Sequence, residues 1–121
     1  MQRQSSEPVW VSIFELIGDT GAISLDDADL VRERIADALR HEETIVVSFA
    51  KMEMVTMAFL MEAIGWLYGE FEEELIREKL HVEDAKPGHL VLLEGAIREA
   101  KDYFADPEAY NAALEEMLND C

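Results

Sequence analysis

Residues 44–71 read TIVVSFAKMEMVTMAFLMEAIGWLYGEF, and this stretch decides the fold. Its first part, residues 44–49, is an apolar, β-branched run without alternation, which is typical of a central strand covered on both faces. After a tight connection, residues 57–71 predict a helix. On a helical wheel one apolar stripe contains Leu60, Ala63, Ile64, Leu67, Tyr68 and Phe71. Glu62 lies on the opposite side of the helix. Phe59, Trp66 and Glu70 lie together on the flank between the two.

The segment before this stretch predicts another strand and helix. Residues 9–17 are rich in β-branched and aromatic residues and alternate in part, as a strand would, and the two glycines of residues 18–21 predict a turn. Ser24, followed by Asp27, has the capping-box pattern of a helix start. That helix should run to about His41, with an apolar face at three- and four-residue spacing made of Ala28, Val31, Ile35, Ala38 and Leu39.

The segment after it predicts a short strand at residues 80–82, following an acidic turn at residues 72–74, and two more helices. Pro87 opens the first of these helices, whose expected buried stripe is Leu90, Leu93, Ala96, Ile97, Ala100 and Phe104. Asp106-Pro107 is a strong start for a terminal helix, with apolar positions Tyr110, Leu114, Met117 and Leu118. Helices alternating with strands predict an α/β or α+β fold, in which helices pack on a small mixed β-sheet.

The global composition suits one acidic domain. The chain has 121 residues, a net charge of −17 and a pI near 4.3. Such a surface repels phosphate backbones and anionic lipid headgroups, so nucleic acid and membranes are poor candidate partners. A solvated acidic surface is the simplest explanation. Adaptation to a salt-rich cytoplasm and mimicry of nucleic acid are the alternatives.

The termini and the cysteine content favour a cytoplasmic protein. Cys121 is the only cysteine, so no intrachain disulfide is possible. The first ten residues contain no apolar segment of a secretory signal, and we expect residues 1–8 to be a disordered lead-in. The most apolar window, residues 54–69, is interrupted by Glu62 and is too short to span a bilayer.

No catalytic motif stands out in the sequence. Phosphate-binding loops and nucleophile elbows are absent. His81, Glu83, Asp84 and His89 are the only group that hints at a metal, but their spacing matches no common ligand motif. Four methionines at positions 52, 54, 57 and 61 are better explained by packing than by a soft metal. We therefore expect no enzyme, no cofactor and no metal.

The segment Ser48-Phe49-Ala50-Lys51-Met52-Glu53-Met54-Val55-Thr56-Met57-Ala58-Phe59-Leu60 carries a family resemblance. It resembles the pattern Asp-Phe-x-Gly-Val-x-x-x-Thr-x-Ser-Phe-Leu of the STAS-like family of unknown function, which is related to the anti-sigma factor antagonist domains. Phe49, Thr56, Phe59 and Leu60 fit, whereas Ser48 and Lys51 depart from the pattern. The resemblance covers roughly residues 9–103. It implies a STAS-like domain at residues 9–105, followed by an extra amphipathic helix at residues 106–121.

The resemblance also implies a function in protein–protein switching. In anti-sigma factor antagonists, a partner kinase phosphorylates a serine at the helix start, and the added charge breaks the complex. Ala58 occupies that position here, so phosphorylation control is lost or moved to Thr56, which is more simply explained as a helix N-cap. The expected function is a non-enzymatic, regulatory binding module whose partner is a histidine-kinase-like ATPase.

The expected partner-binding residues follow from the same helix. Phe59 and Trp66 lie two turns apart beside Glu62 and Glu70, and aromatic residues rimmed by charge are typical of interface hot spots. Packing of this flank against the first or third helix is the simpler alternative. The predicted partner-binding set is Thr56, Ala58, Phe59, Glu62 and Trp66.

Two alternative functions remain open. The chain could be a homodimer or an assembly subunit that pairs through residues 107–118, where Ala109, Ala112 and Ala113 would allow close helix approach. It could also be an acidic nucleic-acid mimic, although its acidic residues are spread over several elements rather than spaced like phosphates.

Overall fold

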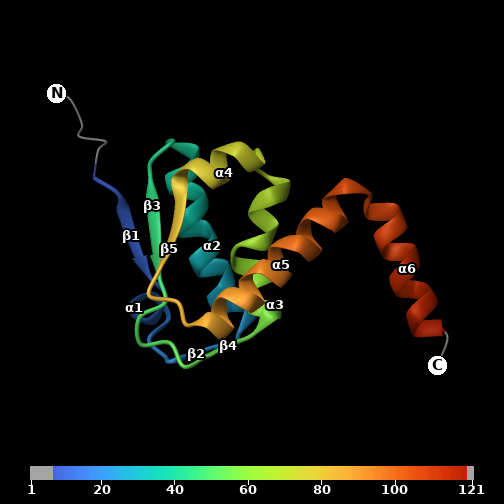
Figure 1. Ribbon diagram of the computed structural model, residues 1–121, viewed down its shortest axis with the longest axis horizontal. Coiled ribbons are helices and arrows are strands. Elements are labelled where there is room, and N and C mark those ends of the chain that lie inside the picture. The colour runs from blue at the N-terminus through green and yellow to red at the C-terminus, as the bar shows by residue number, and fades with distance from the viewer. Residues whose placement is uncertain (1–6, 120–121) are drawn as a thin grey trace.

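The computed structural model describes residues 7–119, so most of the predicted lead-in at residues 1–8 lies outside the described residues. Along the chain the elements are β1 (Val9–Ser12), α1 (Ile13–Ile17), β2 (Gly21–Ala22), α2 (Leu25–Arg40), β3 (Ile45–Ser48), β4 (Met54–Val55), α3 (Met57–Ala63), the 3-10 helix η1 (Gly65–Gly69), α4 (Glu73–Lys79), β5 (Leu80–Glu83), α5 (Pro87–Ala105) and α6 (Pro107–Asn119). Figure 1 shows how the strands and helices are arranged.

Two small sheets organise the fold. The larger has the strand order β1-β3-β5, and β2 pairs with β4 in the smaller. All the pairings are parallel, so the predicted α/β class is confirmed but the sheet is parallel rather than mixed. A parallel arrangement follows from the connections, because helical crossovers return the chain to the same end of the sheet before each new strand begins.

The first predicted strand is shorter than expected. It ends at Ser12, where the hydroxyl accepts a hydrogen bond from the Glu15 backbone N–H at 3.1 Å and starts α1. Gly18 closes this short helix with a φ of 74°, a left-handed conformation that glycine adopts without steric cost. Residues 9–17 therefore form a strand followed by a short helix rather than one strand, because the Ser12 cap ends β1 and starts α1.

The helix predicted for residues 57–71 divides into α3 and η1 at Ile64. Gly65 lies where α5 crosses, and a Cβ there would come within 3.1 Å of the Ala100 Cβ. The acidic residues at positions 72–74 do not form a turn alone, since Glu73 begins α4. Acidic residues in the first turn of α4 and basic residues in its last turn complement the helix dipole, a pattern typical of a helix rather than of a turn.

One core lies between the larger sheet and helices α2, α3 and α5. The predicted apolar faces of α2 and of the central strand β3 are buried, as expected. Leu90 is an exception, because it is 42% exposed rather than part of the α5 stripe. His89 takes the inward position in the first turn of α5, where its ring lies 5.6 Å from that of Phe49.

The terminal helix starts where the sequence predicts. Asp106 Oδ1 accepts a hydrogen bond from the Ala109 backbone N–H at 3.1 Å and α6 follows. Figure 1 shows α6 projecting from the body at the far end of α5. Within the described part of the chain, no helix has the length and apolar character needed to cross a membrane.

Candidate functional site

The start of α3 carries two of the residues predicted to bind a partner. Thr56 is the N-cap of α3, and its hydroxyl accepts a hydrogen bond from the Phe59 backbone N–H at 3.1 Å. This confirms the cap interpretation. Ala58 lies in the first turn of α3 and is exposed to solvent, so a partner can reach it.

Phe59 does not point outward. Its side chain is fully buried, along with those of Leu60 and Ala63 on the same helix. The helical wheel places Phe59 on a flank of the apolar stripe, but α3 packs against both α2 and α5 and so buries a wider arc than one stripe. The prediction that Phe59 contacts a partner is therefore wrong for this conformation.

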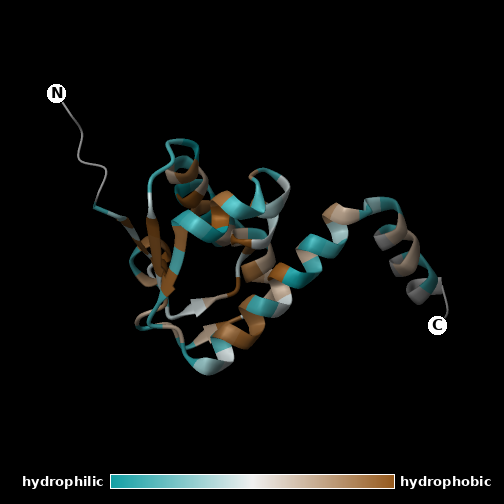
Figure 2. Ribbon diagram, turned by 45° about the horizontal axis from the view of Figure 1, so that its top comes forward, coloured by the Kyte–Doolittle hydropathy of each residue, from teal (hydrophilic) through white to brown (hydrophobic). Residues whose placement is uncertain are grey.

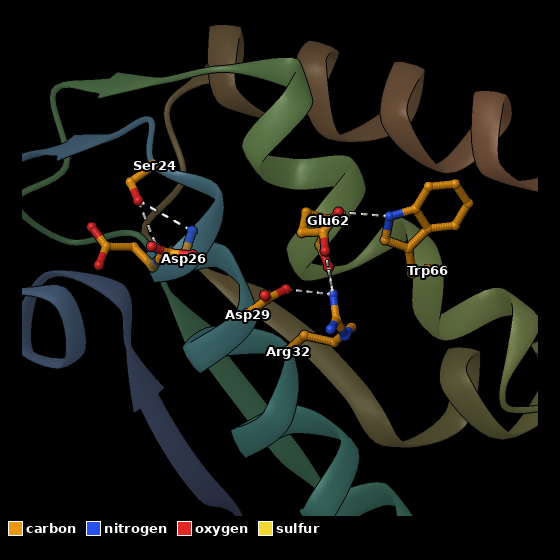
Figure 3. Close-up of polar contacts among 7 residues, drawn as sticks. Ser24, Asp26, Asp29, Arg32, Glu62 and Trp66 are labelled. Carbon is orange, nitrogen blue, oxygen red and sulfur yellow. Dashed lines mark hydrogen bonds and ion pairs between the residues drawn. The ribbon is translucent and has the colours of Figure 1, made fainter.

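Glu62 on α3 and Trp66 on η1 form a junction that also involves α2 and α5 (Figure 3). Arg32 on α2 donates through Nη1 to the Glu62 Oε2 at 3.0 Å and to the Glu62 backbone carbonyl at 2.7 Å. Trp66 Nε1 donates to the other carboxylate oxygen, Glu62 Oε1, at 2.9 Å. The Trp66 ring meets two aromatic rings of α5 edge to face, at centroid distances of 5.5 Å to Tyr103 and 5.4 Å to Phe104.

The electrostatics of this junction favour the charged state of Arg32. Burial alone would lower the pKa of Arg32, but the hydrogen bond and charge of Glu62, together with the charge of Asp29, raise the pKa above its ordinary value. Both side chains of the pair are about three-quarters buried, with 22% and 27% exposure. Glu62 and Trp66 therefore connect α3 and η1 to α2 and α5, which is the simpler role that the sequence left open.

An exposed apolar surface surrounds the start of α3 instead. Met54 lies opposite Gly21 in the β2–β4 pair, while the next pair, Ala22 with Val55, is buried. A Cβ at Gly21, the partner of Met54, would lie 3.6 Å from the Ile23 Cδ1, so Ile23 lies on the same side of this pair as Met54. They are 56% and 53% exposed.

Helix α5 extends this surface. A Cβ at Gly95 would collide with the Met57 methyl, so Met57 lies against α5 at that point. Val91, one helical turn before Gly95, is 68% exposed, and Met57 itself is 37% exposed. We call this region the entry surface and define it as Ile23, Met54, Met57, Ala58 and Val91.

A shallow groove borders the entry surface between β4 and the start of α5. Its volume is about 370 Å³, and its lining residues are Glu53, Met54, Val55, Lys86, Gly88, His89 and Leu92. Figure 2 shows the hydrophobic first turns of α5 at this end of the molecule. Sequence reasoning missed Ile23, Met54 and Val91, because only the pairing of β2 with β4 and the position of α5 bring them together.

The polar residues that hinted at a metal do not converge. His81 and Glu83 lie on β5, Asp84 accepts a hydrogen bond from the Ser48 hydroxyl at 3.1 Å, and His89 packs on Phe49. Over residues 7–119, no group of three or more metal-ligating side chains is positioned to hold an ion. Clustered apolar side chains that remain exposed beside a groove are typical of surfaces that contact another macromolecule.

Comparison with known families agrees with the resemblance in the sequence. A family model described as a STAS-like domain of unknown function (DUF4325) matches residues 27–89. The match lies within the predicted domain at residues 9–105 and extends from α2 to the first turn of α5. Neither a curated protein nor a solved structure matches the chain.

Proposed function

Because the chain belongs to the family of STAS-like domains of unknown function, we propose that it is a non-enzymatic, regulatory binding module. Its partner in this proposal is a histidine-kinase-like ATPase of the anti-sigma type. The ATPase docks on the entry surface, and the adjoining groove receives a side chain of the ATPase.

The exposure of Ala58 carries the proposal. Ala58 occupies the position that the resemblance assigns to a phosphorylated serine, and it lies on the solvent side of α3. The exposed side chains of Met54 and Met57 lie on either side of the Thr56 cap. Clustered apolar side chains that remain exposed in a folded domain are typical of protein interaction sites, and methionine is enriched in interfaces.

The same geometry supports a loss of phosphorylation control at this position. Ala58 has no hydroxyl, so a kinase has no acceptor there. Thr56 is the nearest alternative acceptor, but its side chain is half-buried and accepts the first-turn hydrogen bond of α3. In this proposal control is therefore either absent or moved to Thr56, where a phosphate would lie at the N-terminus of α3.

The test is a binding titration with a purified histidine-kinase-like ATPase from the same genome, measured by isothermal calorimetry. Met54→Glu places a charge on the entry surface, beside the groove, and should weaken binding at least about tenfold. Leu30→Glu is the matched control, because Leu30 on α2 is 51% exposed, lies outside the entry surface and should tolerate the same change. Equal affinity for both variants and the wild type would locate binding elsewhere.

A second pair of variants tests the role of position 58. Ala58→Ser restores the hydroxyl and should leave affinity within about twofold of the wild type, since the side chain is small and exposed. Ala58→Glu introduces a negative charge, in the manner of a phosphate, and should disrupt the complex. A complex that tolerates Ala58→Glu contradicts the proposed docking position.

A further inference from the structure

The structure divides the four methionines around the start of α3 into two pairs. Met52 is 1% exposed, and Met61 is half-buried against the core. Met54 is 56% exposed and Met57 is 37% exposed, and both belong to the entry surface. Packing, which the sequence favoured for all four, therefore explains only Met52 and Met61.

Met54 lies outside the fold although its neighbour on the same strand lies inside. Val55 of β4 is buried, whereas Met54 points to solvent and lines the groove beside α5. Methionine is among the side chains that folded proteins bury most often. An apolar side chain in water contributes little to folding, so the exposure of Met54 points to a role outside the core.

Met57 is covered on one side by α5 and open on the other. A Cβ at Gly95 would lie 2.7 Å from Met57 Cε and 4.0 Å from its Sδ. A glycine within a helix costs about 1 kcal/mol relative to alanine, and here it leaves the space in which the Met57 thioether lies. The thioether is therefore held at the surface, where solvent still reaches it.

The two exposed thioethers flank the position at which the resemblance places a phosphorylated serine. Ala58, which follows Met57, has no hydroxyl. The hydroxyl of Thr56 is half-buried and accepts the Phe59 backbone N–H at 3.1 Å. Between residues 54 and 58, the reactive side chains that solvent reaches most freely are therefore the two thioethers.

A peroxide converts such a thioether into a sulfoxide in one two-electron step. The sulfur lone pair attacks one oxygen of hydrogen peroxide, so that an S–O bond forms and the O–O bond breaks. The sulfur is oxidised, and the peroxide is reduced and leaves as water after proton transfer. The product is a polar group where the side chain was apolar, and methionine sulfoxide reductases reverse the change.

We propose that Met54 and Met57 form a reversible oxidation site, and that their sulfoxides weaken docking of the partner on the entry surface. This inference rests on the proposed function. A partner that covers a sulfoxide must remove water from a polar group, which costs free energy unless a new hydrogen bond replaces the water. Oxidation thus supplies the polar change that Ala58 cannot receive as a phosphate.

Mass spectrometry after treatment with hydrogen peroxide tests the site without the ATPase. The sample is the full chain with Cys121→Ser, because a thiol also reacts with peroxide. Met54 should be oxidised first and Met57 second, while Met52 should react at least about tenfold more slowly than Met54. Equal rates at Met52 and Met54, in a chain that circular dichroism shows to be folded, would overturn the site.

Retention on a phenyl column then measures the apolar character of the surface. The oxidised chain should elute earlier than the reduced chain, and methionine sulfoxide reductases should restore its retention. Met54→Leu/Met57→Leu keeps an apolar surface of similar volume but has no thioether there, so peroxide should leave its retention unchanged. An equal loss of retention in the double variant would refute the proposal, because other side chains must then be responsible.

Calorimetry with the ATPase tests the effect on docking. The oxidised chain should bind at least about tenfold more weakly than the reduced chain. The double leucine variant should bind within about threefold of the wild type both before and after peroxide. Equal affinity of the oxidised and reduced chains would refute the switch and leave the proposed function standing. An ATPase that does not bind the reduced chain would contradict the proposed function itself, and the switch with it.

Discussion

Replacing Glu62 by alanine should lower the free energy of unfolding by about 1.5–2 kcal/mol. The sequence predicted a partner-binding role for this residue, but the structure gives it contacts within the fold. The substitution removes the carboxylate, which accepts one hydrogen bond from Trp66 Nε1 at 2.9 Å and another from Arg32 Nη1 at 3.0 Å. The half-buried indole N–H then has no carboxylate acceptor, which costs about 1 kcal/mol. Arg32 keeps the Glu62 backbone carbonyl and Asp29, so its loss is only about 0.5–1 kcal/mol.

Urea unfolding followed by circular dichroism measures this loss. For a domain of this size the same change lowers Tm by about 6–8 °C. Glu62→Gln should cost less than Glu62→Ala, because the amide oxygen can still accept from Trp66.

Glu70→Ala is the matched control for this prediction. Glu70 also pairs with an arginine of α2, Arg40, at 2.8 Å, but both of these side chains are nearly half exposed. Its loss should therefore cost clearly less than the loss of Glu62, because solvent screens an exposed pair. If Glu62→Ala costs no more than Glu70→Ala, the junction does not hold the helices together and the reasoning is wrong.

Four further substitutions, one of them a control, test other parts of the fold by thermal unfolding. Gly69→Ala should cost about 1–3 kcal/mol, because the new Cβ would collide with the Phe104 ring, whereas Gly88→Ala, with open space around it, should be nearly neutral. Ser24→Ala should cost about 1 kcal/mol, since the Ser24 hydroxyl caps α2, and an unchanged Tm would contradict that role. Hydrogen bonds from Lys101 and then Arg77 lower the pKa of Glu73 below its ordinary value of 4.5. A lowered folded-state pKa stabilises the protein above the unfolded-state pKa and loses this effect as pH falls through the folded value. The Tm difference between wild type and Glu73→Gln should therefore be present at neutral pH and shrink below pH 4.5, and a constant difference would contradict the assignment.

The sequence by itself determined the elements whose signals are local. Ser24 as the cap of α2, Pro87 at the start of α5 and Asp106 at the start of α6 all lie where their patterns predict. The central strand β3 follows from its uninterrupted apolar run. Each of these signals acts within one helical turn or one strand, so a few neighbouring residues contain the whole physical cause. The family resemblance at residues 48–60 is equally local.

Tertiary structure decided which side chains remain outside. A helical wheel assigns Phe59 and Trp66 to one flank of a helix but cannot tell that α2 and α5 cover that flank. The entry surface likewise depends on the pairing of β2 with β4, which sets the side to which Met54 points. The exposure of Trp10 depends likewise on the register of β1 with β3, which places it on the side of the sheet opposite to the core. Exposure depends on contacts between residues far apart in the chain, and no local pattern contains those contacts.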